Sequence, residues 1–261
     1  MRVQPFSFLE QVDTAVVYDP DAEAFFTAAG ITDTTQKNAV NQLVLDLKAD
    51  SIWSKGIALY PFVGGTSSTH SYNLIDPTTY QLSYSGGITH SSTGIKGNGS
   101  TGRYDTDIPL NVLDSDSASI AVYSRDNNTN GVDMGVTAPT VGGIQTNLRN
   151  GASNHTSRAM SDPVLSTSSS NSALFGGVSR QNSTTAATFL NKSKTSFTNS
   201  SSPIGSSLRI FGMCVNTSGG PVVFSSREQG LSWIGEGLTN TDIDNFVDIN
   251  ETYQTALGRF V

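Results

Sequence analysis

The chain has 261 residues with 15 Lys and Arg against 22 Asp and Glu, which gives a formal net charge of −7. This balance disfavours nucleic acids and anionic membranes as partners, because affinity for phosphates comes from clustered basic residues and those of this chain are scattered. A charged fraction of 14%, with abundant Gly, Ser, Thr and Asn, favours a large β-sandwich with polar loops over a helical bundle.

Cysteine usage and hydropathy further limit the classes of protein to which the chain can belong. The single cysteine, Cys214, excludes an intramolecular disulfide, and its place in the apolar run Leu208–Val215 predicts a buried, inert thiol. The first residues, MRVQPFSFLEQ, lack the charged and apolar regions of a secretory signal, and no run approaches the roughly 20 apolar residues of a membrane span. We therefore expect a protein that folds in a cytoplasm.

The amino-terminal part predicts an arm followed by two helices. Residues 1–18 carry two apolar clusters, Phe6–Leu9 and Val16–Tyr18, and we expect them to pack on a neighbour or add a strand. Asp19 and Pro20 then open a short helix that Gly30 ends. A second helix is expected from about Asp33 to Leu47, with Thr32 or Thr34 as its cap. Its apolar residues are spaced i, i+3, i+4, i+7 on one face: Val40, Leu43, Val44 and Leu47.

The stretch from Asp46 to Gly65 marks the change from helix to strand. Its strand, Ile57–Val63, is apolar without clear alternation, which predicts burial on both faces. Trp53, Tyr60 and Phe62 are therefore expected in the core and not in a sugar-stacking platform. Gly64 and Gly65 predict a tight turn after the strand.

Short strands separated by turn residues follow, as in an antiparallel sandwich. The expected strands are Ile57–Val63, Tyr80–Tyr84, Gly102–Asp105, Ser117–Tyr123, Val132–Val136, Gly143–Leu148, Leu174–Ser179, Thr185–Leu190, Leu208–Val215 and Val222–Ser226. The Ser/Thr/Asn-rich segments Ser166–Ser172 and Ser193–Ser202 are expected to be exposed loops. A final helix is predicted by the capping pattern of Thr239 and Asp242, with Gly258 at its end.

The sequence offers no recognisable catalytic motif. His70, His90 and His155 lie in polar contexts without the spacing of a zinc-binding helix. Because His70 and His90 flank Gly-Gly turns, we expect these two to be loop residues that bond to the backbone. No nucleophile elbow, phosphate-binding loop or dinucleotide fingerprint is present. No pair of carboxylates is placed on a predicted strand as in a glycosidase.

Acidic residues concentrate in predicted turns, where Asp commonly forms turns and aids solubility. They are Asp105, Asp107, Asp114, Asp116, Asp126 and Asp133. Loops of a sandwich can also bind sugars through carboxylates, amides and aromatic rings, with calcium as one candidate cofactor. On this hypothesis the ligand-binding residues are Tyr104, Asp105, Asp107, Asp126, Asn127 and Asn128. The identity of any metal stays open, and no cofactor is required.

Two passages resemble a known family. The first, Ile52–Arg103, contains IWSKGIALYPFVGG, and the second, Ser232–Arg259, contains SWIGEGLTNTDIDNF; the helices between Phe25 and Leu47 match as well. Together they resemble bacteriophage virion proteins that carry a concanavalin-A-like or laminin-G-like sandwich after a helical leader. The resemblance implies a mainly β, jelly-roll sandwich with an amino-terminal helical leader, residues 1–51, and a sandwich with a carboxy-terminal helix, residues 52–261. It carries over no catalytic residue.

The leading expectation is a non-enzymatic structural protein of the virion, such as a head fibre, a decoration protein or a tail component. Its partners would be other virion proteins and copies of itself, with a trimer as one option, and its location would be the virion. The alternative is a carbohydrate-binding adhesin that recognises glycans on the host surface. A third reading is a glycan-cleaving hydrolase of the same fold.

Overall fold

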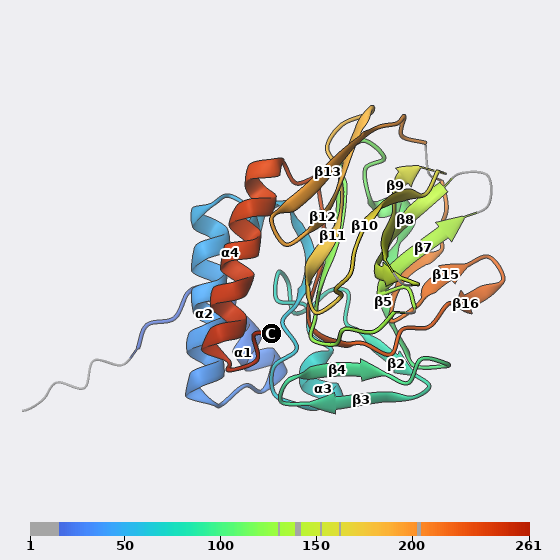
Figure 1. Cartoon of the computed structure of the whole chain (residues 1–261). Helices are drawn as coiled ribbons and strands as arrows, with labels where there is room; N and C mark the ends of the chain where they lie inside the picture. Colours follow the sequence, from blue (N-terminus) through green and yellow to red (C-terminus); the bar gives the residue numbers. More distant parts are fainter. Residues whose placement is uncertain (1–15, 130, 139–141, 152, 162, 203–204) are drawn as a thin grey trace, which may run out of the picture.

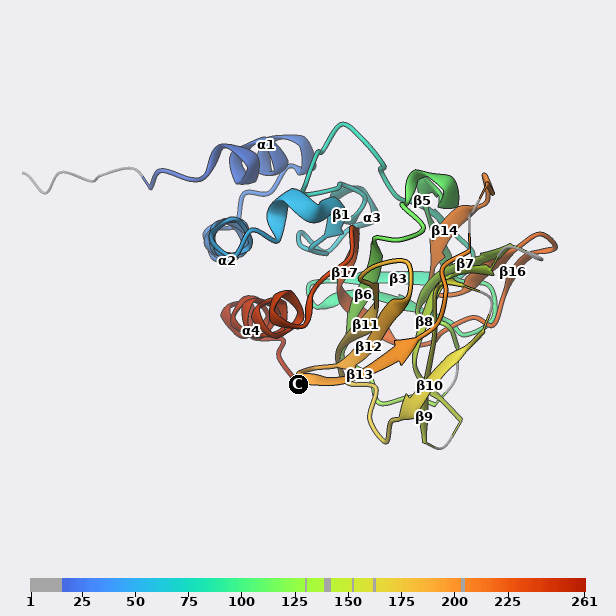
Figure 2. The same ribbon diagram turned by 90° about the horizontal axis from the view of Figure 1, so that it is seen from above.

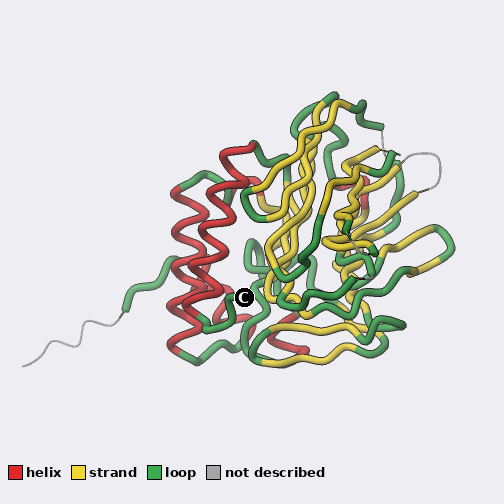
Figure 3. The backbone as a smooth tube through the Cα atoms, viewed as in Figure 1, coloured by secondary structure: helices red, strands yellow, loops and turns green. Residues whose placement is uncertain are grey.

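The computed structural model describes residues 16–129, 131–138, 142–151, 153–161, 163–202 and 205–261. They form three layers: a layer of helices, a sheet that the helices cover (sheet A), and a second sheet (sheet B) packed on the other side of the first (Figures 1 and 2). The helices gather on one side of the strands (Figure 3). Within these ranges no helix is long and apolar enough to cross a membrane.

The helices follow the chemistry of their ends. Asp19 caps α1 with its side chain, Pro20 opens the helix, and Gly30 ends it with a φ of 69°. Thr239 and Asp242 form the predicted capping box of α4. The second helix differs from expectation, because Asp33 and not Thr32 or Thr34 accepts the amide of Gln36. The helices are α1 (Pro20–Ala29), α2 (Thr34–Ala49), α3 (Ser67–His70) and α4 (Asn240–Ala256), with 3-10 turns at Trp53–Lys55 and Leu110–Val112.

Sheet A is antiparallel and has eight strands within the described residues. Its order is β13 (Ser193–Thr198), β12 (Thr185–Leu190), β11 (Leu174–Arg180), β6 (Ala118–Ser124), β17 (Glu228–Gly235), β4 (Gly94–Gly97) and β3 (Ile88–Ser91), and β1 (Gly56–Tyr60) also pairs with β17.

Sheet B has nine strands within the same ranges, and all its pairs are antiparallel except the contact of β15 with β7. Its order is β10 (Leu165–Ser168), β9 (Asn154–Ser161), β8 (Gly142–Asn150), β7 (Met134–Ala138), β14 (Arg209–Gly212), β5 (Arg103–Pro109) and β2 (Ser83–Ser85), with β15 (Val215–Thr217) and β16 (Gly220–Val222) as an attached hairpin.

Two hydrophobic clusters hold the layers together. One joins the helices to sheet A and includes Phe25 of α1 and Trp233 of β17; the other fills the space between the two sheets. Strand β1 contributes to both, with Leu59 in the first cluster and Tyr60 in the second. The predicted burial of this strand on both faces is therefore confirmed. Because the first cluster runs across residue 51, the helices after Tyr18 pack on their own sandwich.

Several strands were not expected. One of them is β17, a central strand of sheet A, whose polar side chains Gln229 and Ser232 are fully buried. The Ser/Thr-rich segments predicted as loops contain β10 and β13, which are edge strands with one polar face. The unpredicted strands are β3, β4, β9, β10, β13 and β17.

The aromatic residues near the helix-to-strand boundary lie largely where the sequence predicts. Tyr60 and Phe62 are buried between the sheets, and the half-buried Trp53 packs at the edge of the helical cluster. Gly64 and Gly65 form the expected turn with φ values of 88° and 77°, a region that favours glycine. The arm proposed for residues 1–18 lies outside the described residues up to residue 15.

Candidate functional site

The two sheets differ in what covers their outer faces. Helices cover the outer face of sheet A, whereas polar side chains lie on the outer face of sheet B. On β5 the alternation is regular: Tyr104, Thr106 and Ile108 point into the core, so Arg103 and Asp105 point outward. The outer face of sheet B is therefore the sheet face to which a ligand has access.

A shallow hollow of about 250 Å³ lies on this face beside β14 and β5. Phe211 lies directly opposite Asp105 in the antiparallel pair, so an aromatic ring and a carboxylate are neighbours across the strands. The hollow is lined by Asp105, Ser207, Leu208, Arg209, Phe211 and Asn216.

A local irregularity brings two carboxylates together at its rim. Between the pairs Arg209–Pro109 and Phe211–Asp105 the register shifts, and Asp107 takes a left-handed φ of 59°. The Asp105 carboxylate accepts the Asp107 amide at 2.9 Å, which supports this conformation. The Arg209 guanidinium then lies 3.0 Å from the Asp105 carboxylate and 3.1 Å from that of Asp107.

A second guanidinium completes the face. The Arg103 guanidinium carbon lies 5.8 Å from the centre of the Phe211 ring, within the range of a cation–π contact. The Asn216 amide donates to the Arg209 carbonyl at 2.9 Å. The hollow thus combines an aromatic surface with carboxylate, guanidinium and amide groups, which can contact both the C–H and the hydroxyl groups of a polar ligand.

The predicted ligand residues divide into three groups. Asp105 and Asp107 lie together at this hollow. Tyr104 does not, because it is fully buried and its hydroxyl is hydrogen-bonded to Gln229 and Ser232, each at 2.9 Å. The prediction of Tyr104 as a ligand residue is wrong, since the two-residue period of β5 turns it into the core.

The remaining predicted residues, Asp126, Asn127 and Asn128, lie on the loop after β6, where they bond to other parts of the fold. Asp126 pairs with Lys96 of β4 at 2.6 Å, and the Asn127 side chain accepts the Ser172 amide at 3.1 Å. Among the described residues, no hydrogen bond or ion pair joins the side chains of this loop to Asp105 or Asp107. The structure therefore does not bring the six predicted residues together.

Five residues that line the hollow were missed by the sequence analysis: Ser207, Leu208, Arg209, Phe211 and Asn216. Arg209 and Phe211 fall in a run predicted as a strand, and Asn216 follows it. The alternation Arg-Ile-Phe-Gly, with Ile210 and Gly212 buried, is the signal that could have placed Arg209 and Phe211 on an open face. Their pairing with Asp105, about a hundred residues away in sequence, is a long-range contact that local patterns do not reveal.

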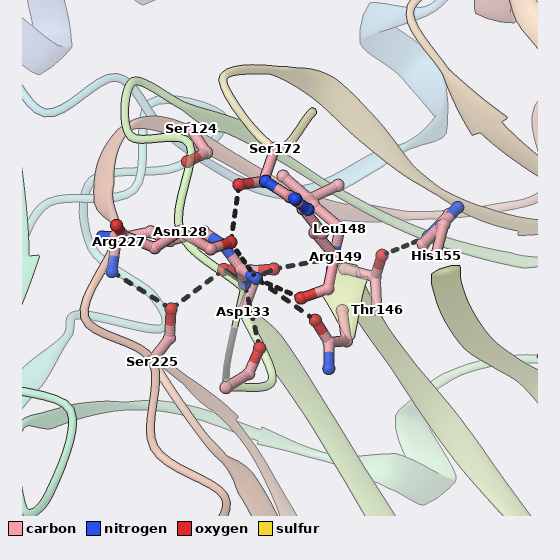
Figure 4. A network of polar contacts seen from close by, with 12 residues as sticks. Ser124, Asn128, Asp133, Thr146, Leu148, Arg149, His155, Ser172, Ser225 and Arg227 are labelled. Carbon is pink, nitrogen blue, oxygen red and sulfur yellow. Dashed lines mark hydrogen bonds and ion pairs between the residues drawn. The ribbon is translucent and has the colours of Figure 1, made fainter. Parts of the chain in front are cut away.

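A buried polar network holds the loop after β6 (Figure 4). Arg227 and Asp133 form an ion pair at 2.7 Å with both side chains fully buried, and Arg227 also donates to the carbonyls of Asn128, Gly131 and Arg149. Asp133 accepts the Leu148 amide as well. Asp133 lies at a bend just before β7, but the predicted role in solubility is wrong, because its charge is paired in the interior.

The prediction of His70 and His90 as loop residues is wrong, because His70 lies in α3 and His90 on β3. The Gly65 amide donates to Nε2 of His70, so Nδ1 of His70 carries the proton and donates to Nδ1 of His90 at 3.0 Å. His155 lies on β9 between the Thr146 and Ser157 hydroxyls. Burial lowers the pKa of both His70 and His155 to about 3.

These histidines predict a loss of stability in mild acid. Their ordinary pKa is 6.5, so between pH 6.5 and 3 the unfolded chain binds protons that the folded chain does not. Their contribution is complete above pH 6.5 and decreases as the pH falls. At pH 5 each buried histidine is expected to lower the free energy of unfolding by about 2 kcal/mol relative to pH 7.

Urea unfolding at pH 7 and pH 5 measures this difference. Replacing His70 by Asn should remove about half of it. Equal free energies of unfolding at the two pH values would contradict the assignment of both rings as neutral.

The described residues include one buried cysteine and no group arranged as a metal site. Cys214 is buried, as predicted, and burial raises the pKa of its thiol to about 12. Among the described residues no group of three or more His, Cys, Asp or Glu side chains is arranged to hold a metal ion.

Together these elements define the fold as an antiparallel β-sandwich with amino-terminal helices and a carboxy-terminal helix. No protein-family model matches the chain. No curated protein matches it either.

Solved structures do match. A mutant of Trypanosoma rangeli sialidase displaying trans-sialidase activity aligns over 83% of this chain with a TM-score of 0.56 and 7% identity. The receptor binding domain of botulinum neurotoxin mosaic serotype C/D aligns over 76% with a TM-score of 0.50 and 12% identity. This chain spans 39% of the sialidase and 51% of the toxin domain.

Domain 4 of AbnA, an extracellular arabinanase from Geobacillus stearothermophilus solved with arabinotriose, aligns over 74% of this chain and 98% of its own, with a TM-score of 0.49 and 14% identity. At these identities the likeness concerns the fold alone.

Proposed function

We propose that this protein is a non-enzymatic, carbohydrate-binding component of a bacteriophage virion, and that it binds glycans at the hollow beside Phe211. The observation that carries the binding role is the conjunction of an aromatic ring with two carboxylates on the sheet face that the helices leave open. An aromatic face packs against the C–H groups of a sugar ring, and carboxylates accept hydrogen bonds from its hydroxyl groups.

The fold supports this role, because sandwiches similar to this one occur in a sialidase and in a toxin receptor-binding domain. The phage assignment is supported by the sequence resemblance of Ile52–Arg103 and Ser232–Arg259 to virion proteins. A virion protein that displays a glycan-binding face would contact other virion proteins through other surfaces and host glycans through this one.

The site favours binding over hydrolysis. Glycoside hydrolysis requires one carboxyl that donates a proton and a second that acts as base or nucleophile. Asp105 and Asp107 instead share the same guanidinium, that of Arg209, which suits a fixed, charged recognition surface better than proton transfer.

Two measurements test the proposal. The purified protein is expected to bind members of an array of bacterial surface polysaccharides without releasing reducing ends from them. Release of reducing ends that is lost in Asp105→Asn would instead assign a hydrolase.

The virion assignment is tested separately by electron microscopy of particles from the phage that encodes the chain. Density for the sandwich on the particle surface is the expected result. Its absence from purified particles, with glycan binding retained, would overturn the virion assignment and leave the binding role intact.

A further inference from the structure

A second hollow, of about 220 Å³, lies on the helical layer between α2 and α4. The two helices lie side by side in Figures 1 and 2. Buried apolar side chains form its floor, and small or polar residues form its rim. The floor consists of Ala39, Leu43, Ile249 and Tyr253, and the rim of Thr35, Asn38, Gln42, Asp46, Thr252 and Ala256.

The size and lining of this hollow suit apolar side chains. A protein cavity of about 150 Å³ is enough for a benzene ring, so there is room here for one phenyl ring with part of a neighbouring side chain. Leu45, 42% exposed, extends the apolar surface, because it shares a helix face with Asn38 and Gln42 at the spacing i, i+4, i+7. Grooves between helices commonly bind segments that present a few apolar anchors.

Tyr18, near the start of the described residues, contacts the rim of this hollow. Tyr18 packs edge-on against Phe26, and its hydroxyl donates to Asn38, a rim residue of the hollow, at 3.3 Å. Before Tyr18, Val16 and Val17 are 62% and 91% exposed. The amino-terminal segment therefore joins the described chain next to α2, where the Tyr18 hydroxyl contacts a residue on the rim of the hollow.

The segment that precedes carries suitable anchors. Phe6, Phe8 and Leu9 form an apolar cluster with one serine between the two aromatic residues. An extended chain spans about 3.3 Å per residue, so the eight residue-to-residue steps from Leu9 to Val17 reach about 26 Å. Helix α2, with 16 residues, is about 24 Å long, so the cluster can reach any part of the hollow.

We propose that the hollow between α2 and α4 is the docking site for the apolar cluster Phe6–Leu9 of this chain. The cluster of the same copy occupies it, because the chain before Tyr18 is long enough to reach the hollow. The side chains of Phe6, Phe8 and Leu9 then cover Leu43, Ile249 and Tyr253.

Disulfide trapping in the full chain tests this directly. The single native cysteine is buried, so engineered pairs react without interference from it. Phe8→Cys is combined with Thr252→Cys on the rim, or, as the matched control, with Glu251→Cys. Thr252 and Glu251 are adjacent exposed positions on α4, but Glu251 lines a different hollow on the other side of the helix.

Under mild oxidation the Thr252 pair is expected to form a disulfide at least ten times faster than the Glu251 pair. A cross-link within one chain is the expected product, whereas a cross-linked dimer as the main product would overturn docking in the same copy. Equal rates for the two pairs, or no disulfide with Thr252→Cys while circular dichroism shows folded protein, would overturn it.

A second measurement tests the two anchors that remain when position 8 is a cysteine. Replacing Phe6 and Leu9 by Ser in the Phe8→Cys, Thr252→Cys protein should slow disulfide formation at least tenfold, because the anchors that hold the segment are removed. An unchanged rate would show that the segment only collides with the hollow, and would equally overturn the proposal.

Discussion

Replacing Arg227 by Met is expected to lower the free energy of unfolding by about 3–5 kcal/mol, the range found when one partner of a buried ion pair is removed. The substitution leaves the Asp133 carboxylate buried without its counter-charge. It also removes the donors to the carbonyls of Asn128, Gly131 and Arg149. Urea unfolding followed by circular dichroism measures the loss.

Two further variants separate charge from packing. Arg209→Met removes a guanidinium from an exposed pair and should change stability by no more than about 1 kcal/mol. Adding Asp133→Asn to Arg227→Met should recover part of the loss, because the unpaired charge is gone. If Arg227→Met alone stays within about 1 kcal/mol of the parent, the network of Figure 4 does not have the structural role we assign to it.

Phe25→Ala is expected to have a comparable effect through a different mechanism. Phe25 of α1 is fully buried in the cluster that joins the helices to sheet A, and truncating a buried Phe costs about 3–5 kcal/mol. Because this cluster also contains Trp233 of β17 and Phe246 of α4, the loss should be shared by the sandwich.

The measurement is thermal unfolding followed by far-ultraviolet circular dichroism and by tryptophan fluorescence. A single transition that moves to lower temperature for both signals is expected, since Trp233 lies beneath the helices in the shared cluster. Two separate transitions, with only the first moved by Phe25→Ala, would show that the helical leader unfolds independently.

The elements that the sequence predicts well are those fixed by local chemistry. The ends of α1 follow from Asp19, Pro20 and Gly30, and the start of α4 from Thr239 and Asp242, because each cap is satisfied within a few residues. Strand β1 is recognisable because both of its faces are apolar.

The elements that the sequence misses depend on distant partners. Strand β17 begins with two polar residues, Glu228 and Gln229. Gln229 is nevertheless buried, because it bonds to the Tyr104 hydroxyl and the Asp133 carbonyl, contacts that exist only in the folded sheet pair. Strands β10 and β13 are rich in Ser and Thr, which are also common in exposed loops. These segments form strands because they pair with the edge of a sheet, and the local sequence does not show that pairing.

The candidate site also combines residues that the sequence indicates with residues that only the fold brings together. Asp105 and Asp107 could be nominated because acidic residues are visible in any sequence. The Phe211 ring could not, since only the pairing of β14 with β5 places it beside them. Tyr104 was nominated with its neighbours although strand alternation turns it inward.

The most direct test of the account is the affinity of the full chain for the polysaccharide that it binds most strongly on the array, measured for three variants. Phe211→Ala and Asp105→Asn alter the hollow on sheet B, while Asp126→Asn alters an acidic residue outside it. We expect the first two to weaken binding at least tenfold and Asp126→Asn to leave it unchanged. Unchanged affinity in Phe211→Ala and Asp105→Asn, with the fold retained, would contradict the assignment of this face as the glycan-binding site.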